Sequence, residues 1–274
     1  MAFLRSCLLL GMIVAVALFA WAHHNARIDP IVRRGQIGFR DWPRSIAPVR
    51  VAVLSDIHIG NESMDAARLR RIVGQVNGLK PDLVLLAGDY IAGHRAKPAR
   101  IFAPHLVAPL AALRAPLSIV AVMGNHDYDT DPAIILRALR AAGIRVLRNE
   151  AVARGGLTIA GIDDLLHGRQ DIPKTLAAVR LLPGIPIALS HSSSTALLDG
   201  GITLELVGHT HCGQVDLEPF GLTNAVAASN YRCGISRTSR GITLVTAGVG
   251  TSIVPFRVNA PPDLWLLTLG PATR

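Results

Sequence analysis

Buried strands alternate with amphipathic helices through the first half of the chain, and this pattern constrains the fold more than any other feature. Apolar runs predict buried strands over 49–55, 82–87 and 117–122, and the first run is rich in β-branched residues. Helical spacing of apolar residues predicts helices over 65–79, 100–113 and 132–142. Strands and helices that alternate at this spacing are typical of a parallel sheet with crossover helices, so the sequence predicts an α/β fold.

The second half of the chain is richer in strands. Short apolar runs predict them over 157–161, 185–189, 204–207, 242–246 and 264–269. No internal repeat, low-complexity tract or domain boundary interrupts the sequence after Val49, so residues 49–274 are predicted to form one domain. Residues 25–48 contain three prolines and several arginines, and we predict a linker there, with regular structure beginning at Val49.

Residues 1–24 form an apolar segment outside the predicted domain. The run from Cys7 to Ala22 carries no charge and has arginines on both sides. It is shorter than the roughly 20 residues that a spanning helix needs, and the flanking residues extend it. We favour an uncleaved, single-pass anchor in the cell membrane. Because Ala20-Trp21-Ala22 has the form of a signal-peptidase site, export after cleavage is the alternative, and the side of the membrane is left open.

Polar clusters directly follow five of the predicted strands. They contain Asp56, His58, Asp89, Asn125, His126, Asp127, His191, His209 and His211. Ligand sites of open α/β sheets gather beyond the carboxyl ends of the strands, so we expect these side chains to converge. Their oxygen and nitrogen donors suit hard to borderline divalent cations.

Hydrolysis of a phosphate ester gives a chemical reason for such a set. Two cations roughly 3.5–4 Å apart can stabilise both the attacking and the leaving oxygen of an in-line displacement. One carboxylate must bridge the two cations, and each cation needs further ligands and an open position for water. Water bound to such cations loses a proton near neutral pH and becomes a nucleophile.

The polar clusters form an ordered series of motifs, which are Asp56-x-His58, Gly88-Asp89, Gly124-Asn125-His126-Asp127, His191 and Gly208-His209-x-His211. This series spans more than half of the chain and resembles the calcineurin-like metallophosphoesterase superfamily. The resemblance implies a four-layer αββα sandwich of two mixed sheets flanked by helices. A narrower resemblance, to the membrane-associated YkuE/YaeI-type branch, rests on the apolar N-terminus, on Tyr231 and on residues 161–164, 208–214, 247–250, 255–257 and 260–263. Two departures from that branch are Cys212 in place of glycine and the lack of a proline shortly after His191.

The resemblance also implies a role for each side chain. One metal would be held by Asp56, His58 and His211, the other by Asn125, His191 and His209, and Asp89 would bridge the two. His126 would stay off the metals and either donate a proton to the leaving oxygen or stabilise the charged, phosphorane-like state. Asp127 would orient His126 through the other nitrogen of the imidazole ring. The implied cofactor is two divalent metal ions, and Mn, Fe and Zn all suit these ligands.

The implied protein is a dinuclear metal-dependent phosphoesterase that hydrolyses a phosphodiester or pyrophosphate bond by attack of a metal-bound hydroxide. A net charge of +9 favours an anionic substrate, and the apolar segment favours one at a membrane. The leading substrate class is a lipid-linked or head-group phosphate, including a UDP-diacylglucosamine-type pyrophosphate. Soluble or nucleic-acid phosphodiesters are the first alternative, although an aromatic content of 4% disfavours nucleic acid. A non-catalytic metal-binding scaffold is the second alternative.

Further residues are candidates for supporting roles. His94, Tyr231 and Arg257 are candidates for contact with substrate. Because the sequence has no CxxC spacing, we predict that Cys212 and Cys233 are free thiols, and pairing is the alternative for an exported chain. The sequence carries no signal of an oligomeric state.

Overall fold

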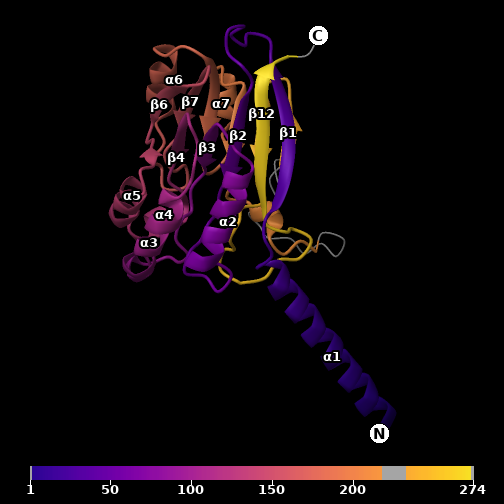
Figure 1. Cartoon of the computed structure of the whole chain (residues 1–274). Helices are drawn as coiled ribbons and strands as arrows, with labels where there is room; N and C mark the ends of the chain where they lie inside the picture. Colours follow the sequence, from indigo (N-terminus) through magenta and orange to yellow (C-terminus); the bar gives the residue numbers. More distant parts are fainter. Residues whose placement is uncertain (1, 218–232, 273–274) are drawn as a thin grey trace.

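Two six-stranded mixed sheets pack face to face, and helices cover both outer faces (Figure 1). The structure is a computed structural model that describes residues 2–217 and 233–272. The central strands are apolar on both faces because one face packs on the opposite sheet and the other packs on helices. The predicted α/β fold and its four-layer αββα architecture are confirmed.

The first sheet contains segments from both halves of the chain. In spatial order its strands are β1 (Ile31–Phe39), β12 (Asp263–Pro271), β2 (Val49–Leu54), β3 (Leu83–Leu86), β4 (Ser118–Ala121) and β5 (Arg145–Val146). Strands β2 to β5 are parallel to one another. Strand β12 runs antiparallel to β2 and parallel to β1. The carboxyl ends of β2, β3 and β4 therefore share one edge of the sheet.

The second sheet has the same mixed character. In spatial order its strands are β10 (Gly234–Arg237), β11 (Ile242–Val245), β9 (Leu204–Val207), β8 (Ile185–Leu189), β7 (Leu157–Gly161) and β6 (Glu150–Arg154). The four central strands are parallel, and the two edge strands are antiparallel to their neighbours. The carboxyl ends of β8 and β9 thus also lie together.

Helices complete the two outer layers. The first sheet is covered by α2 (Ala66–Gly78), α3 (Ala96–Ala111), α4 (Asn125–Thr130) and α5 (Pro132–Ala141), and the second by α6 (Ile172–Arg180) and α7 (Thr195–Asp199). Local signals set where these helices begin. The Asp65 carboxylate accepts a hydrogen bond from the Arg68 amide at the start of α2. Asp131 caps α5, whose first residue is Pro132.

The segment predicted to be a linker contains a strand. β1 lies within residues 25–48 and pairs with β12 along its whole length, from Ile31 opposite Asp263 to Phe39 opposite Pro271. The prediction that regular structure begins at Val49 is therefore wrong. β1 is an edge strand whose residues are mostly exposed or half-buried, so it lacks the apolar run that marks the central strands.

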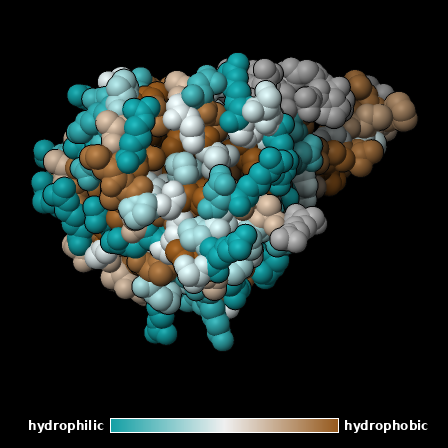
Figure 2. Space-filling view, turned by 90° about the horizontal axis from the view of Figure 1, so that it is seen from above, coloured by the Kyte–Doolittle hydropathy of each residue, from teal (hydrophilic) through white to brown (hydrophobic). Residues whose placement is uncertain are grey.

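The N-terminal segment is a single helix, α1 (Ala2–Asn25), which projects away from the sandwich (Figure 1). Among the described residues it is the one helix long and apolar enough to cross a membrane, with a mean hydropathy of 2.3. Figure 2 shows its hydrophobic side chains extending beyond the edge of a surface on which hydrophilic and hydrophobic residues are mixed. Because β1 starts directly beyond α1 and runs antiparallel to β2, α1 leaves the sandwich at the end where β2, β3 and β4 finish.

Candidate metal centre

The polar clusters that follow β2, β3, β4, β8 and β9 come together at one end of the sandwich. A cavity of about 530 Å³ opens there, and its walls include Asp89, Asn125, His126, His209 and His211. Strand direction explains the convergence, because all five clusters follow the carboxyl ends of parallel strands. The structure thus brings residues from Asp56 to His211 into one site.

One group of donor atoms belongs to Asp56, His58 and His211. The three atoms lie within 4.8 Å of one another. The two Nε2 atoms of His58 and His211 are 3.2 Å apart, and His211 Nε2 is 3.2 Å from Asp56 Oδ1. Two imidazole nitrogens and a carboxylate oxygen that face one buried point form a donor set for a divalent cation.

His191 is at the centre of a second group of donor atoms. Its Nε2 is 3.1 Å from Asn125 Oδ1, 3.2 Å from His209 Nδ1 and 3.2 Å from Asp89 Oδ2. Its Nδ1 donates a hydrogen bond to the carbonyl of Ala87 at 2.7 Å. That bond directs Nε2 toward the other donors, as the outer hydrogen bond of a metal-binding histidine does.

Asp89 lies between the two groups. Its Oδ2 is 3.2 Å from His191 Nε2 and 3.5 Å from His58 Nε2. Its other oxygen, Oδ1, accepts a hydrogen bond from the His126 amide at 3.0 Å. This placement suits a carboxylate shared by two cations.

The buried carboxylates give the site a negative charge that divalent cations can neutralise. Asp56 and Asp89 are almost completely buried, and Asp56 Oδ1 faces the Nε2 atoms of His58 and His211 at 3.8 and 3.2 Å. Burial raises the pKa of both carboxyls, but the surrounding histidines more than offset this and hold each pKa below its usual range. Burial lowers the pKa of His58 to about 3, so its imidazole is neutral. Burial lowers the pKa of His191, but the Asp89 and Asp56 carboxylates more than offset this and raise it to about 10. Asp56, Asp89 and His58 thus offer deprotonated ligands, whereas a cation beside His191 must displace the proton on its ring.

The backbone of the site is strained. Five of the seven expected ligands have φ between +48° and +67°, namely Asp56, His58, Asp89, His209 and His211. Non-glycine residues rarely adopt this left-handed conformation, and it clusters at functional sites. The motif glycines allow close approach, because a Cβ on Gly124 would collide with the Asp89 carboxylate and one on Gly208 with the Ser55 hydroxyl.

His126 has both ring nitrogens committed outside the two groups. Its Nδ1 donates a hydrogen bond to the Gly93 carbonyl at 3.0 Å, and its Nε2 is 3.2 Å from Ser252 Oγ. The ring lies edge-on to His58, with centroids 4.9 Å apart. A nitrogen of His126 also lies within 4.8 Å of donor atoms of His58 and Asp89, so the ring borders the site and faces its cavity.

Asp127 has a different position from the one expected. Its carboxylate accepts hydrogen bonds from the amides of Gly124, Asp89 and Tyr90 at 2.9, 3.0 and 2.9 Å. The prediction that it orients His126 through the ring is wrong, because the Gly93 carbonyl holds that nitrogen. Asp127 instead ties the loop after β3 to the loop after β4, which fixes Asp89 relative to Asn125.

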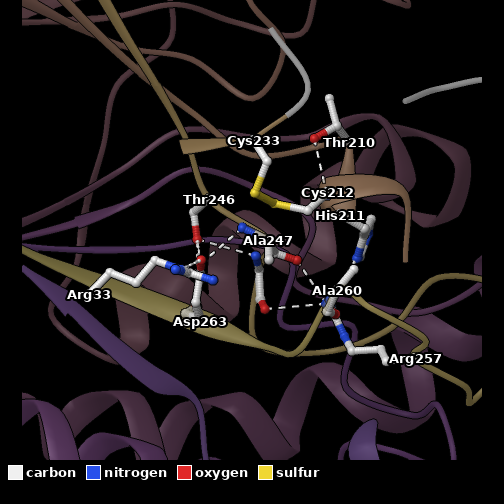
Figure 3. The surroundings of a disulfide bond; sticks show 11 residues. Arg33, Thr210, His211, Cys212, Cys233, Thr246, Ala247, Arg257, Ala260 and Asp263 are labelled. Carbon is white, nitrogen blue, oxygen red and sulfur yellow. Dashed lines mark hydrogen bonds and ion pairs between the residues drawn. A yellow bond between two sulfur atoms is a disulfide. The ribbon is translucent and has the colours of Figure 1, made fainter. Parts of the chain in front are cut away.

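A disulfide adjoins the His211 loop (Figure 3). Cys212 is bonded to Cys233, which directly precedes β10, and their Cα atoms are 4.9 Å apart. The prediction of two free thiols is therefore wrong, and the alternative of a paired state is the one observed. The bond ties the residue after a candidate ligand to the edge strand of the second sheet.

Arg257 lies beside His211 and holds the neighbouring segment 247–260 through its backbone (Figure 3). It is completely buried, and it donates hydrogen bonds to the carbonyls of Ala247, Gly250 and Ala260. Its Nη2 is 3.4 Å from His211 Nδ1. Burial lowers its pKa to about 10, which still leaves it charged at neutral pH. A direct contact with substrate is excluded by this burial, so that expectation is wrong.

The remaining candidates lie around the cavity or outside the described residues. His94 is exposed at the rim, with Nδ1 2.9 Å from Asp129 Oδ2, and is placed where a substrate contact is feasible. Tyr231 lies outside the described residues. Sequence reasoning missed Ser252, which touches His126, and the buried Gln214, which binds the backbone of residues 252–254. Gln214 belongs to the motif at 208–214, and its place in that motif was the one sequence feature that pointed to it.

Comparison with known proteins gives an independent result. The profile of the family described as Calcineurin-like phosphoesterase matches residues 49–213. The chain is 31% identical over 282 residues to a transmembrane protein with a metallophosphoesterase domain from Danio rerio, an alignment that covers 95% of this chain and 62% of that protein. The chain thus spans less than two thirds of that relative's length.

Two bacterial relatives match over larger shares of their own lengths. The chain is 30% identical over 244 residues to the uncharacterized metallophosphoesterase YkuE of Bacillus subtilis, covering 83% of this chain and 81% of YkuE. It is 29% identical over 250 residues to the phosphodiesterase YaeI of Escherichia coli, covering 87% of each. With the family profile matched over more than half of its length and the motif residues gathered in one site, the chain belongs to the calcineurin-like phosphoesterase family.

Proposed function

We propose that the protein is a dinuclear metal-dependent phosphoesterase that hydrolyses a phosphodiester or pyrophosphate bond. The observation that carries this proposal is the position of Asp89, whose Oδ2 lies between one donor group and the other, at 3.5 Å from His58 Nε2 and 3.2 Å from His191 Nε2. Asp56, His58 and His211 would hold one cation, and Asn125, His191 and His209 the other. Bound divalent cations would supply charge stabilisation and activate water near neutral pH. The identity of the metal, among Mn, Fe and Zn, depends on supply as well as on the ligands.

His126 is the proposed proton donor. Because the Gly93 carbonyl can only accept, the hydrogen of the neutral ring is on Nδ1, and Nε2 faces Ser252 and the cavity. A proton taken up at Nε2 can pass to a leaving oxygen within hydrogen-bond reach. Asp127 contributes by fixing the backbone of Asp89 and Gly124, and it acts without touching the reacting atoms.

A phosphate on a lipid or lipid-linked head group is the proposed substrate class, with a UDP-diacylglucosamine-type pyrophosphate as one member. The net charge of +9 and the apolar α1 support an anionic substrate at a bilayer. The relatives named as transmembrane proteins support the same reading. Soluble phosphodiesters are the alternative, and the printed name of YaeI is compatible with it. Turnover that depends on lipid would separate the two.

We place the protein in the cell membrane with α1 as a retained, single-pass anchor. The last turns of α1 pack on the domain, since Phe19 and Phe256 have ring centroids 4.6 Å apart and Ala22 accepts a hydrogen bond from the Arg257 amide. Cleavage after Ala22 would remove these contacts, which supports retention over export. Since disulfides persist in oxidising compartments, the bond between Cys212 and Cys233 supports a domain on the non-cytoplasmic side.

The test is a comparison of wild type with Asp89→Asn in the presence of Mn²⁺. A bis-aryl phosphate serves as the generic substrate, followed by phosphorylated lipids and nucleotides. The variant keeps the size of the side chain but removes the charge shared by the two groups, so we expect a loss of about 10²-fold or more in turnover. The matched control is Asp65→Asn, at the exposed N-cap of α2, where asparagine also caps and activity should be unchanged.

Two outcomes would count against the proposal. Near-normal turnover by Asp89→Asn would remove the shared carboxylate from the mechanism. Failure of metal-loaded wild type to hydrolyse any of these substrates would favour the non-catalytic metal-binding scaffold.

A further inference from the structure

The loop at residues 251–257 displays two apolar side chains beside the site. Ile253 is 80% exposed and Val254 is 40% exposed. Ile253 has φ of +57°, and a β-branched residue in this left-handed conformation is an uncommon and costly choice. Asparagine or glycine would adopt that backbone without the same penalty, so the isoleucine needs a reason beyond local structure.

The loop is held firmly in this outward-facing form. The buried Gln214 side chain donates to the carbonyls of Ser252 and Val254 at 2.9 and 3.0 Å and accepts from the Ser252 amide at 2.8 Å. Ser252 Oγ also lies 3.2 Å from His126 Nε2. The residues on both sides of Ile253 are thus fixed, and its exposure follows from an ordered framework.

The same loop contacts the base of α1. The Phe256 ring packs on Phe19 with centroids 4.6 Å apart, and the Arg257 amide donates to the Ala22 carbonyl at 3.0 Å. α1 leaves the sandwich at the end where β2, β3 and β4 finish (Figure 1), and the residues beyond those strand ends line the cavity. A bilayer that contains α1 would therefore lie against the end of the domain at which Ile253 projects.

The surroundings of the loop also suit a lipid surface. Leu166, which is 58% exposed, lines the site cavity together with Ile253, so exposed apolar residues flank its mouth. Arg95 and Lys97 are exposed between His94 and Pro98, which line the adjoining hollow with Ile253. Basic side chains at this level would attract anionic head groups.

One acidic residue near α1, Glu62, would repel anionic head groups, but basic side chains lie beside it. Glu62 is exposed there, but its backbone carbonyl accepts from Arg27 and its carboxylate is 3.8 Å from His23 Nε2. The acidic group is therefore accompanied by two basic side chains.

We infer that the Ile253–Val254 loop docks into the surface of the bilayer that holds α1, so that the metal site opens onto the head-group layer. Apolar side chains of this kind enter the boundary between head groups and acyl chains and hold a peripheral surface in place. The inference rests on the proposed function in two respects, the retention of α1 as a membrane anchor and the lipid-borne substrate. It assigns to residues 253–254 the task of orienting the site toward that substrate.

Depth-dependent quenching in nanodiscs tests the inference with the full chain. The nanodiscs contain phosphatidylcholine and phosphatidylglycerol, with or without nitroxide groups on the upper acyl chain. In a Cys7→Ser background, an environment-sensitive fluorophore is attached to Ile253→Cys or to the matched control Leu181→Cys. Leu181 is 84% exposed, but it follows α6 near the amino end of β8, at the opposite end of the sandwich.

The expected result is strong quenching at 253 and little at 181. Insertion at the acyl boundary should remove about half or more of the fluorescence at position 253. Equal quenching at the two positions, or none at 253, would overturn the inference. Quenching needs no turnover, so a failed hydrolysis assay would leave this result intact, and failed docking would leave hydrolysis of a bis-aryl phosphate intact.

A second variant tests whether the Ile253 side chain itself causes docking, with the fluorophore at another position. With the fluorophore at Leu166→Cys, the change Ile253→Asn removes the apolar side chain and suits the positive φ, so the fold should be retained. Loss of most of a buried isoleucine's transfer free energy should lower the equilibrium constant for docking about tenfold or more, and quenching at 166 should fall. Unchanged quenching at 166, with the unfolding temperature of the variant preserved, would also overturn the inference.

Discussion

The disulfide between Cys212 and Cys233 makes a quantitative prediction about stability. Cys233 is exposed, so Cys233→Ser removes the bond without opening a hole in the core. The bond closes a loop with a sequence separation of 21. The chain-entropy estimate for a loop of this length is about 3 kcal/mol of stability, through the restriction of the unfolded state. For a domain of this size that corresponds to a decrease in unfolding temperature of about 6–12 °C.

Thermal unfolding under non-reducing conditions is the assay, and the control is built into the chain. Cys7 is a free, exposed cysteine, so Cys7→Ser should unfold at the wild-type temperature. Reduction of wild type should reproduce the effect of Cys233→Ser, and reduction of that variant should add little. A thiol titration of the denatured chain without reductant should find one reactive cysteine out of three.

Metal affinity is the second observable. Cys212 directly follows His211, so the loss of the bond releases a loop that carries a donor. We expect Cys233→Ser to bind Mn²⁺ more weakly than Cys7→Ser does. If wild type and Cys233→Ser unfold within about 1 °C of each other, the entropic reasoning is refuted. Three reactive thiols in the denatured wild type would refute the bond itself.

Two further variants test buried ionisable side chains. Burial raises the pKa of Glu205 from 4.5 to about 8, so the folded state loses stability as pH rises through this range. The free energy of unfolding of Glu205→Gln should therefore exceed that of wild type by about 3 kcal/mol at pH 7 and by about 1 kcal/mol or less at pH 5. Urea unfolding measures both values, and equal gains at the two pH values would contradict the reasoning. Arg257→Met leaves at least three buried carbonyls without their donor and should lower the free energy of unfolding by about 3 kcal/mol or more. Arg257→Lys should restore part of this stability, because an ammonium has fewer donors than a guanidinium. An unchanged unfolding temperature in Arg257→Met would count against this role.

The central fold could be predicted because its strands are buried on both faces. The apolar runs at 157–161, 185–189 and 204–207 match β7, β8 and β9 in both bounds. β1 was missed because an edge strand with a half-exposed face shows weak periodicity, and its pairing with β12 joins segments far apart in the sequence. Patterns along the chain report burial well and long-range pairing poorly.

The site was partly predictable for a related reason. Donor residues at strand ends indicate where a site forms, because strand direction brings those ends together. The supporting residues carry no such signal. Asp127 accepts backbone amides, Arg257 donates to backbone carbonyls, and Gln214 holds the loop at 252–254 through its backbone. Since their partners are main-chain groups of distant segments, only the folded chain reveals these roles.

The left-handed backbone affects which substitutions the site can accept during evolution. It occurs at Asp56, His58, Asp89, His209 and His211. Each such residue costs about 1–3 kcal/mol that the surrounding sandwich must absorb. A descendant freed from catalysis could replace a donor by glycine, relax the turn and become more robust while losing its metal. Selection for the proposed hydrolysis would therefore have to act against substitutions that folding alone favours.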